Sequence, residues 1–157
     1  HNDLKPDNFM VAVNENIYLL DLAYAMLEDP EMSLDDQSKQ ATRAYLAPER
    51  IYGIIKPEQS SDIYSWGVLA YETLTGQKPI DFGSSEEEKE RTAQEVYSGI
   101  KKPKHILELK PDLDNGLAET VMKALEHNPE DRYQSMKEIE DRLVNIIEKR
   151  QENRLGS

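Results

Sequence analysis

The sequence predicts an α+β protein that is mainly helical and carries one small β-hairpin near its start. Two short apolar runs, 9–13 and 17–20, are separated by the turn-forming segment Asn14-Glu15-Asn16, which is typical of a hairpin. Four later segments have apolar residues either on one helical face or on nearly every face. We therefore expect one domain over 1–150, followed by a frayed tail over 151–157.

The hairpin is followed by a long loop and then by a buried helix. Segment 28–43 is polar and has no apolar period. Loops of this length within compact domains are usually functional or disordered. Segment 63–74 is apolar on nearly every face, which predicts a helix surrounded by protein.

Three amphipathic helices complete the expected fold. Segment 86–98 begins with three glutamates, which the helix dipole favours, and stops at Gly99. The next apolar stripe ends before Asn128-Pro129 and consists of Leu117, Val121, Ala124 and Leu125. The last helix begins at a capping box formed by Ser135 and Glu138. Its apolar face carries Met136, Ile139, Leu143, Ile146 and Ile147.

The composition excludes several classes of partner. The 157 residues include 19 basic and 31 acidic side chains, and the net charge of −12 repels phosphate backbones. No stretch approaches the ~20 apolar residues of a membrane span. With no cysteine, the chain has no disulfide framework and no thiolate metal site. We expect no nucleic acid and no membrane among its partners, and a cytoplasmic location.

The hairpin brings chemically useful side chains together. Asn8 precedes its first strand and Asp21 follows its second, so a carboxamide and a carboxylate should lie side by side. Oxygen ligands of this kind suit Mg²⁺. Asp3 and Lys5 lie on the loop that leads into Asn8. A carboxylate, an ammonium group and a magnesium pair at one place are what phosphoryl transfer requires.

Five motifs carry a resemblance to eukaryotic-type protein kinases. His1-Asn2-Asp3-Leu4-Lys5-Pro6-Asp7-Asn8 resembles the catalytic loop H-R-D-L-x-x-x-N of that family. Asp21-Leu22-Ala23 stands where the family has D-F-G, and Ala47-Pro48-Glu49 is its A-P-E. Asp62-Ile63-Tyr64-Ser65-Trp66-Gly67 is similar to D-x-W-S-x-G, and Asn128-Pro129-Glu130-Asp131-Arg132 to N-P-x-x-R. The five motifs follow the family's order across almost the whole chain.

The resemblance implies catalytic roles and two cofactors, ATP and Mg²⁺. Asp3 would be the catalytic base, and Lys5 would lie against the γ-phosphate of ATP. Asn8 and Asp21 would hold Mg²⁺. Thr42 and Tyr45 match the family's substrate-facing T-x-x-Y. Lys5 together with Thr42 resembles the serine/threonine branch of the family. The expected substrate is therefore a serine or threonine hydroxyl of a protein.

The resemblance also implies structural roles. Glu49 and Arg132 would form an ion pair that ties the end of the long loop to the helices. Asp62 would hold the backbone of the catalytic loop from the buried helix, and His1 would support the same loop.

Two departures from the family pattern bear on regulation. Asn2 replaces the arginine that captures a phosphate in many relatives, and an amide cannot form that bidentate pair. We therefore expect activation without a phosphate held by the catalytic loop. Leu22-Ala23 replaces Phe-Gly, and Ala23 lacks the freedom of glycine at positive φ.

The motifs cover only the later half of the family's pattern. No G-x-G-x-x-G occurs, so the resemblance implies a partial kinase domain: the large helical C-lobe without the small N-lobe. We expect the parent to be a serine/threonine kinase and this piece to be inactive alone. It would need its missing N-lobe or self-associate through an uncovered face that includes Phe9, Val11, Leu19 and Leu20. The alternative is a pseudokinase or truncated lobe that serves as a non-catalytic binding module.

Overall fold

The computed structural model describes residues 1–14, 16–20, 43–52 and 58–155. Strands β1 (Phe9–Val11) and β2 (Ile17–Leu19) pair in antiparallel register, with Met10 opposite Tyr18. The predicted hairpin is therefore confirmed. Leu22-Ala23 and nearly all of the expected loop 28–43 lie outside the described residues, and only Arg43 of that loop is described.

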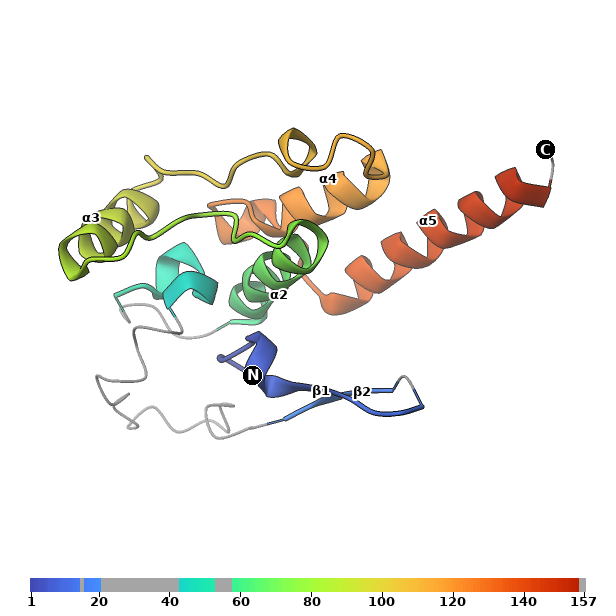
Figure 1. The fold of residues 1–157 in the computed structure, drawn as a ribbon, viewed down its shortest axis with the longest axis horizontal. Coiled ribbons are helices and arrows are strands. Elements are labelled where there is room, and N and C mark those ends of the chain that lie inside the picture. The colour runs from blue at the N-terminus through green and yellow to red at the C-terminus, as the bar shows by residue number, and fades with distance from the viewer. Residues whose placement is uncertain (15, 21–42, 53–57, 156–157) are drawn as a thin grey trace.

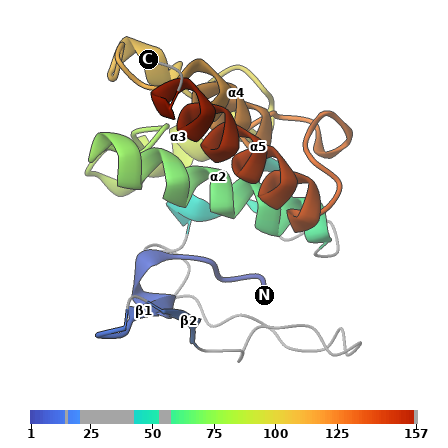
Figure 2. The ribbon, with the colours of Figure 1, turned by 90° about the vertical axis from the view of Figure 1, so that its right-hand side faces the viewer.

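Four α-helices account for most of the regular secondary structure of the described chain. They are α2 (Gln59–Thr75), α3 (Glu86–Tyr97), α4 (Asn115–Ala124) and α5 (Met136–Leu155). Figures 1 and 2 show the helices gathered in one body, with the hairpin beside it and α5 extending away at the C-terminal end. All four were predicted. The structure is thus mostly helical with one two-stranded sheet, as the sequence indicated.

The core forms where α2 packs on α4. Tyr71 and Val68 of α2 are completely buried, as is Val121 of α4. The two helices approach closely because α2 has a glycine at the contact. A Cβ on Gly67 would lie 3.0 Å from the Cβ of Ala124, tighter than ordinary packing allows. Helix α2 is therefore surrounded by protein, as its all-round apolar pattern predicted.

Helix ends follow local capping chemistry. The Ser135 hydroxyl accepts the backbone N–H of Glu138 at 3.3 Å, as expected for the start of α5. Ser85 and Glu88 form a second, complete capping box at the start of α3. This box was not predicted from the sequence, because Glu88 lies within a run of glutamates. Helix α5 continues to Leu155, beyond the domain boundary expected at 150.

The hairpin exposes apolar side chains on both of its faces. Val11 and Ile17 are paired neighbours and are 69% and 67% exposed. Met10 and Tyr18 occupy the opposite face and are also exposed. A two-stranded hairpin alone is marginally stable in water. None of the described helices has the length and apolar character needed to cross a lipid bilayer.

Tyr71 provides a test of the core. Its hydroxyl is buried and has no hydrogen-bond partner within the described part of the chain, and such a group costs about 1–3 kcal/mol. We expect Tyr71→Phe to raise the free energy of unfolding of the 157-residue chain by about 1 kcal/mol in urea titrations.

Tyr45→Phe is the matched control, because the Tyr45 hydroxyl donates to Glu72 at 2.6 Å. Losing a hydrogen bond to a charged group should cost about 1.5–3 kcal/mol. A loss of stability in Tyr71→Phe as large as that in Tyr45→Phe would contradict the unpaired hydroxyl.

Candidate active site

The first turn of α2 holds the backbone of the loop that leads into β1. The Asp62 carboxylate accepts a hydrogen bond from the backbone N–H of Asn2 at 2.9 Å and another from the backbone nitrogen of His1 at 2.6 Å. Asn2 has φ +67°, the left-handed region in which asparagine is enriched among non-glycine residues. The amide that replaces the family's arginine therefore suits this backbone. The contact expected between Asp62 and the loop backbone is confirmed.

Asp3 is buried at the centre of this loop. It is 5% exposed, and its Oδ2 lies 2.7 Å from Nζ of Lys5 and 3.1 Å from Nδ2 of Asn8. Nδ2 of Asn8 also donates to the carbonyl of Asp3 at 2.7 Å. The other carboxylate oxygen, Oδ1, is buried without a hydrogen-bond partner among the described residues. Asp3, Lys5 and Asn8, predicted as functional residues, therefore meet at one place.

The short turn Pro6–Asn8 positions Asn8 for this contact. It is a 3-10 helix with Pro6 at its first position, where a missing N–H costs nothing. The backbone N–H of Leu20 donates to the carbonyl of Asn8 at 2.7 Å, so β2 returns beside Asn8 immediately before Asp21. Asp21 itself lies outside the described residues. Nε2 of His1 lies 3.1 Å from the carbonyl of Leu20, which ties the loop to the end of β2.

Of the two predicted magnesium ligands, only Asn8 lies among the described residues. Both hydrogen bonds of the Asn8 side chain in the described chain use Nδ2, which leaves its carbonyl oxygen for another role. Amide and carboxylate oxygens are the ligands that Mg²⁺ takes. Within the described ranges, no group of three or more His, Cys, Asp or Glu side chains could hold a metal.

The segment 43–52 is fastened to α2. Ser65 donates to the carbonyl of Tyr45 at 2.7 Å, and the Tyr45 hydroxyl donates to Glu72 at 2.6 Å. Burial and this hydrogen bond raise the pKa of the Tyr45 hydroxyl. Tyr45 is thus buried and internally bound, so its expected contact with substrate stays a prediction. Thr42 lies outside the described residues.

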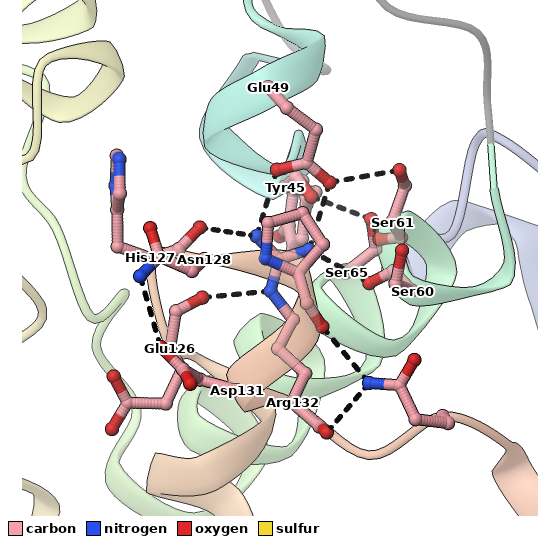
Figure 3. A network of polar contacts seen from close by, with 12 residues as sticks. Tyr45, Glu49, Ser60, Ser61, Ser65, Glu126, His127, Asn128, Asp131 and Arg132 are labelled. Carbon is pink, nitrogen blue, oxygen red and sulfur yellow. Dashed lines mark hydrogen bonds and ion pairs between the residues drawn. The ribbon is translucent and has the colours of Figure 1, made fainter.

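Glu49 and Arg132 form a buried, bidentate ion pair, shown in Figure 3. Nη1 of Arg132 donates to Oε1 at 2.9 Å, and Nη2 donates to Oε2 at 2.8 Å. The remaining donors of the guanidinium reach the carbonyls of Ser60, Glu126 and His127 at 2.8–2.9 Å. All five N–H groups of the arginine are therefore used. The ion pair expected from the resemblance is confirmed.

The surroundings of this pair favour the charged form of the Glu49 carboxyl. Burial alone would raise the pKa of the Glu49 carboxyl, but the hydrogen bond and charge of Arg132 and the Ser61 hydroxyl at 3.0 Å hold it below its ordinary value. The guanidinium carbon of Arg132 also lies 5.0 Å from the centre of the Tyr64 ring, a cation–π contact.

Sequence reasoning missed several polar residues of this site. Ser60, Ser61 and Ser65 are buried residues of α2. Serine is neutral to unfavourable within a helix, so three buried serines in one helix indicate polar contacts. Their spacing was a usable signal: Ser61 and Ser65 are four residues apart and so share one helical face. Glu72, which binds Tyr45, follows on a later turn of α2.

A family model for the protein kinase domain matches residues 1–144. The chain belongs to the protein kinase family. A probable serine/threonine-protein kinase of Clostridium acetobutylicum is 30% identical over 146 residues, which cover 93% of this chain and 21% of that protein. The serine/threonine-protein kinase Pkn1 of Myxococcus xanthus is 33% identical over 141 residues, with coverages of 87% and 19%.

Not all kinase relatives carry the same specificity in their names. The tyrosine-protein kinase MasK of Myxococcus xanthus is 29% identical over 147 residues, which cover 94% of this chain and 22% of that kinase. The chain spans about a fifth of the length of the curated kinases that it matches.

Arg132→Ala should destabilise the chain strongly. The substitution leaves the Glu49 carboxylate buried without its partner, which typically costs about 3–5 kcal/mol. Arg142→Ala is the matched control, because Arg142 pairs with Glu119 at 3.1 Å on the surface. That change should stay within about 1 kcal/mol. Equal losses in urea titrations of the two variants would contradict a special role for Arg132.

The Glu49 pair also predicts a dependence on pH. The pKa of Glu49 lies below its ordinary value of 4.5 in the folded chain, so the unfolded chain binds this proton first as pH falls. The stabilisation is complete above 4.5 and is lost as pH falls from there through the lower folded pKa. The stability gap between the unsubstituted chain and Glu49→Gln should therefore narrow below pH 4.5. A gap that stays constant from neutral pH to about pH 3 would contradict the depressed pKa.

Proposed function

We propose that this chain is the helical large lobe of a serine/threonine protein kinase that transfers the γ-phosphate of ATP to a protein hydroxyl. The observation that carries the proposal is the state of Asp3. One of its carboxylate oxygens is held by Lys5 and Asn8, and the other is buried without a partner among the described residues. A buried acceptor of this kind is suited to a substrate hydroxyl.

Asp3 orients the hydroxyl and receives its proton. The unpaired Oδ1 accepts the hydrogen bond from the attacking group, and the contacts at Oδ2 fix the rotation of the carboxylate. The hydrogen bond from the Asn2 N–H to Asp62 holds the backbone next to Asp3 in place. General base catalysis by a side chain positioned in this way contributes about 10²–10⁴ in rate.

Lys5 and the magnesium ligands account for the charge of the transferred group. Lys5 lies 2.7 Å from Asp3, so its ammonium stands beside the base, where it would neutralise negative charge on the transferred phosphoryl group. Asn8 and Asp21 would hold Mg²⁺, which neutralises negative charge on the phosphates when bound. The return of β2 beside Asn8 supports this pairing of ligands.

The assignment to serine and threonine rests on two residues and on relatives. Lys5 in the catalytic loop and Thr42 ahead of Tyr45 follow the serine/threonine pattern. Relatives named serine/threonine-protein kinases support it, although one relative is named a tyrosine-protein kinase.

We also propose that the lobe alone is inactive and that its hairpin packs against further protein. The apolar side chains of β1 and β2 are exposed on both faces of the hairpin. Soluble proteins rarely expose large apolar patches unless another protein covers them. In an intact kinase the small lobe and the segments beside it would cover this surface. The alternative function, a non-catalytic binding module, would use the same exposed hairpin for a partner.

Replacing the base tests the catalytic assignment. In the full-length kinase, Asp3→Ala should lower kcat by at least ~10², the low end for general base catalysis. Asp7→Ala is the matched control, since Asp7 lies exposed on the same loop and should leave kcat unchanged. Unchanged turnover in Asp3→Ala would refute the role of Asp3. Phosphotyrosine as the main product would refute only the serine/threonine specificity.

The isolated chain tests the proposal about the lobe. Calorimetric titration with Mg-ATP should show weak or no binding, and light scattering should show self-association through the exposed hairpin. Val11→Thr with Ile17→Thr should reduce the association, because it lowers the apolar area of one face. A monodisperse monomer that binds ATP with micromolar affinity would overturn the proposal.

A further inference from the structure

A pocket of about 530 Å³ lies away from Asp3, among three separate segments of the chain. Its walls come from the start of the 3-10 turn Arg43–Tyr45, from the stretch that follows α2, and from α3. Ala44, Ile80 and Phe82 supply apolar surface. Its charged side chains are Arg43, Lys78, Asp81 and Lys89.

The charged side chains that line this pocket are mainly cationic, in a chain that is acidic as a whole. Three cations and one carboxylate line it, whereas the chain as a whole has 19 basic and 31 acidic side chains. The single carboxylate, Asp81, already accepts the backbone N–H of Gly83 at 2.8 Å. The three cations come from three different segments, so the fold rather than a local run of basic residues gathers them.

The ion pairs of these cations leave them able to bind a ligand. Arg43 contacts Glu90 at 3.0 Å, Lys78 contacts Glu72 at 3.2 Å, and Lys89 contacts Glu86 at 2.7 Å. None of the three glutamates lines the pocket. Partly exposed pairs of this kind contribute little to stability, and each cation has several N–H donors. A carboxylate that enters the pocket can therefore share these donors at small cost.

We infer that this pocket binds an acidic side chain of the protein substrate, so that the kinase prefers acceptor residues with a nearby aspartate or glutamate. The inference rests on the proposed kinase function. Arg43 directly follows Thr42, for which the family resemblance implies contact with the substrate. The apolar wall of the pocket accommodates the methylene groups of the acidic residue.

The test compares two peptides in the full-length kinase. One has an acceptor serine flanked by glutamates, and the other has glutamines at the same positions. We expect kcat/KM for the glutamate peptide to be at least about tenfold higher, mostly through KM, since the contact adds binding rather than chemistry. The preference should weaken as salt concentration rises. Varying the position of a single glutamate then locates the acidic residue relative to the acceptor.

Lys89→Gln should reduce the preference about fivefold, and Lys78→Gln should act in the same direction. Lys137→Gln is the matched control, because Lys137 pairs with Glu140 at the same helical spacing as Lys89 with Glu86, but on α5. It should leave the preference unchanged. Lys89→Glu should disfavour the glutamate peptide further.

Binding of the same fluorescent peptides, measured by anisotropy, separates this inference from the proposed function. In one outcome neither peptide is phosphorylated, but the glutamate peptide binds better and Lys89→Gln removes the difference. This result would support binding of an acidic side chain in the pocket and would refute the kinase assignment. If both peptides are phosphorylated and bind equally, or if a lysine-flanked peptide is preferred, the inference is overturned. A glutamate preference that survives in both Lys89→Gln and Lys78→Gln also overturns it.

Discussion

The buried guanidinium of Arg132 is the constraint on which the rest of the described structure depends. Burying an arginine without partners would cost far more than a domain of this size can compensate. Here one carboxylate and three backbone carbonyls use its five donors. These partners come from the segment before Ile51, from the start of α2 and from the turn after α4. The three regions must therefore come together in one arrangement, since any other leaves a buried donor unsatisfied.

Helix α2 passes this constraint on to the candidate active site. Its first turn carries Ser61, which contacts Glu49, and Asp62, which holds the backbone at Asn2. Further along, Ser65 and Glu72 hold Tyr45 through its carbonyl and its hydroxyl. One helix thus fixes both the loop with Asp3 and the segment near the pocket. Its apolar packing against α4 gives the rigidity that such a platform needs.

The sequence predicted the elements better than it predicted their polar contacts. Helix periods and the turn between the strands are local signals, so the hairpin and four helices were found. The motifs also predicted the pairing of Glu49 with Arg132. The carbonyl partners of Arg132 could not be predicted, because every residue has a backbone carbonyl and the residue type does not show which one accepts a hydrogen bond. The pocket was missed for a related reason: Arg43, Lys78 and Lys89 are far apart in sequence, and only the fold gathers them.

The separation of Glu49 and Arg132 along the chain has a consequence for biosynthesis. The two residues are 83 positions apart, and the ribosome adds about 5–20 residues per second. Glu49 is therefore added to the nascent chain roughly 4–17 s before Arg132 is added. During that interval the loop with Asp3 and the segment that contains Glu49 lack the contacts of Arg132. A nascent chain of this kinase family member thus contains Asp3, Lys5 and Asn8 well before it contains the arginine that fixes their support.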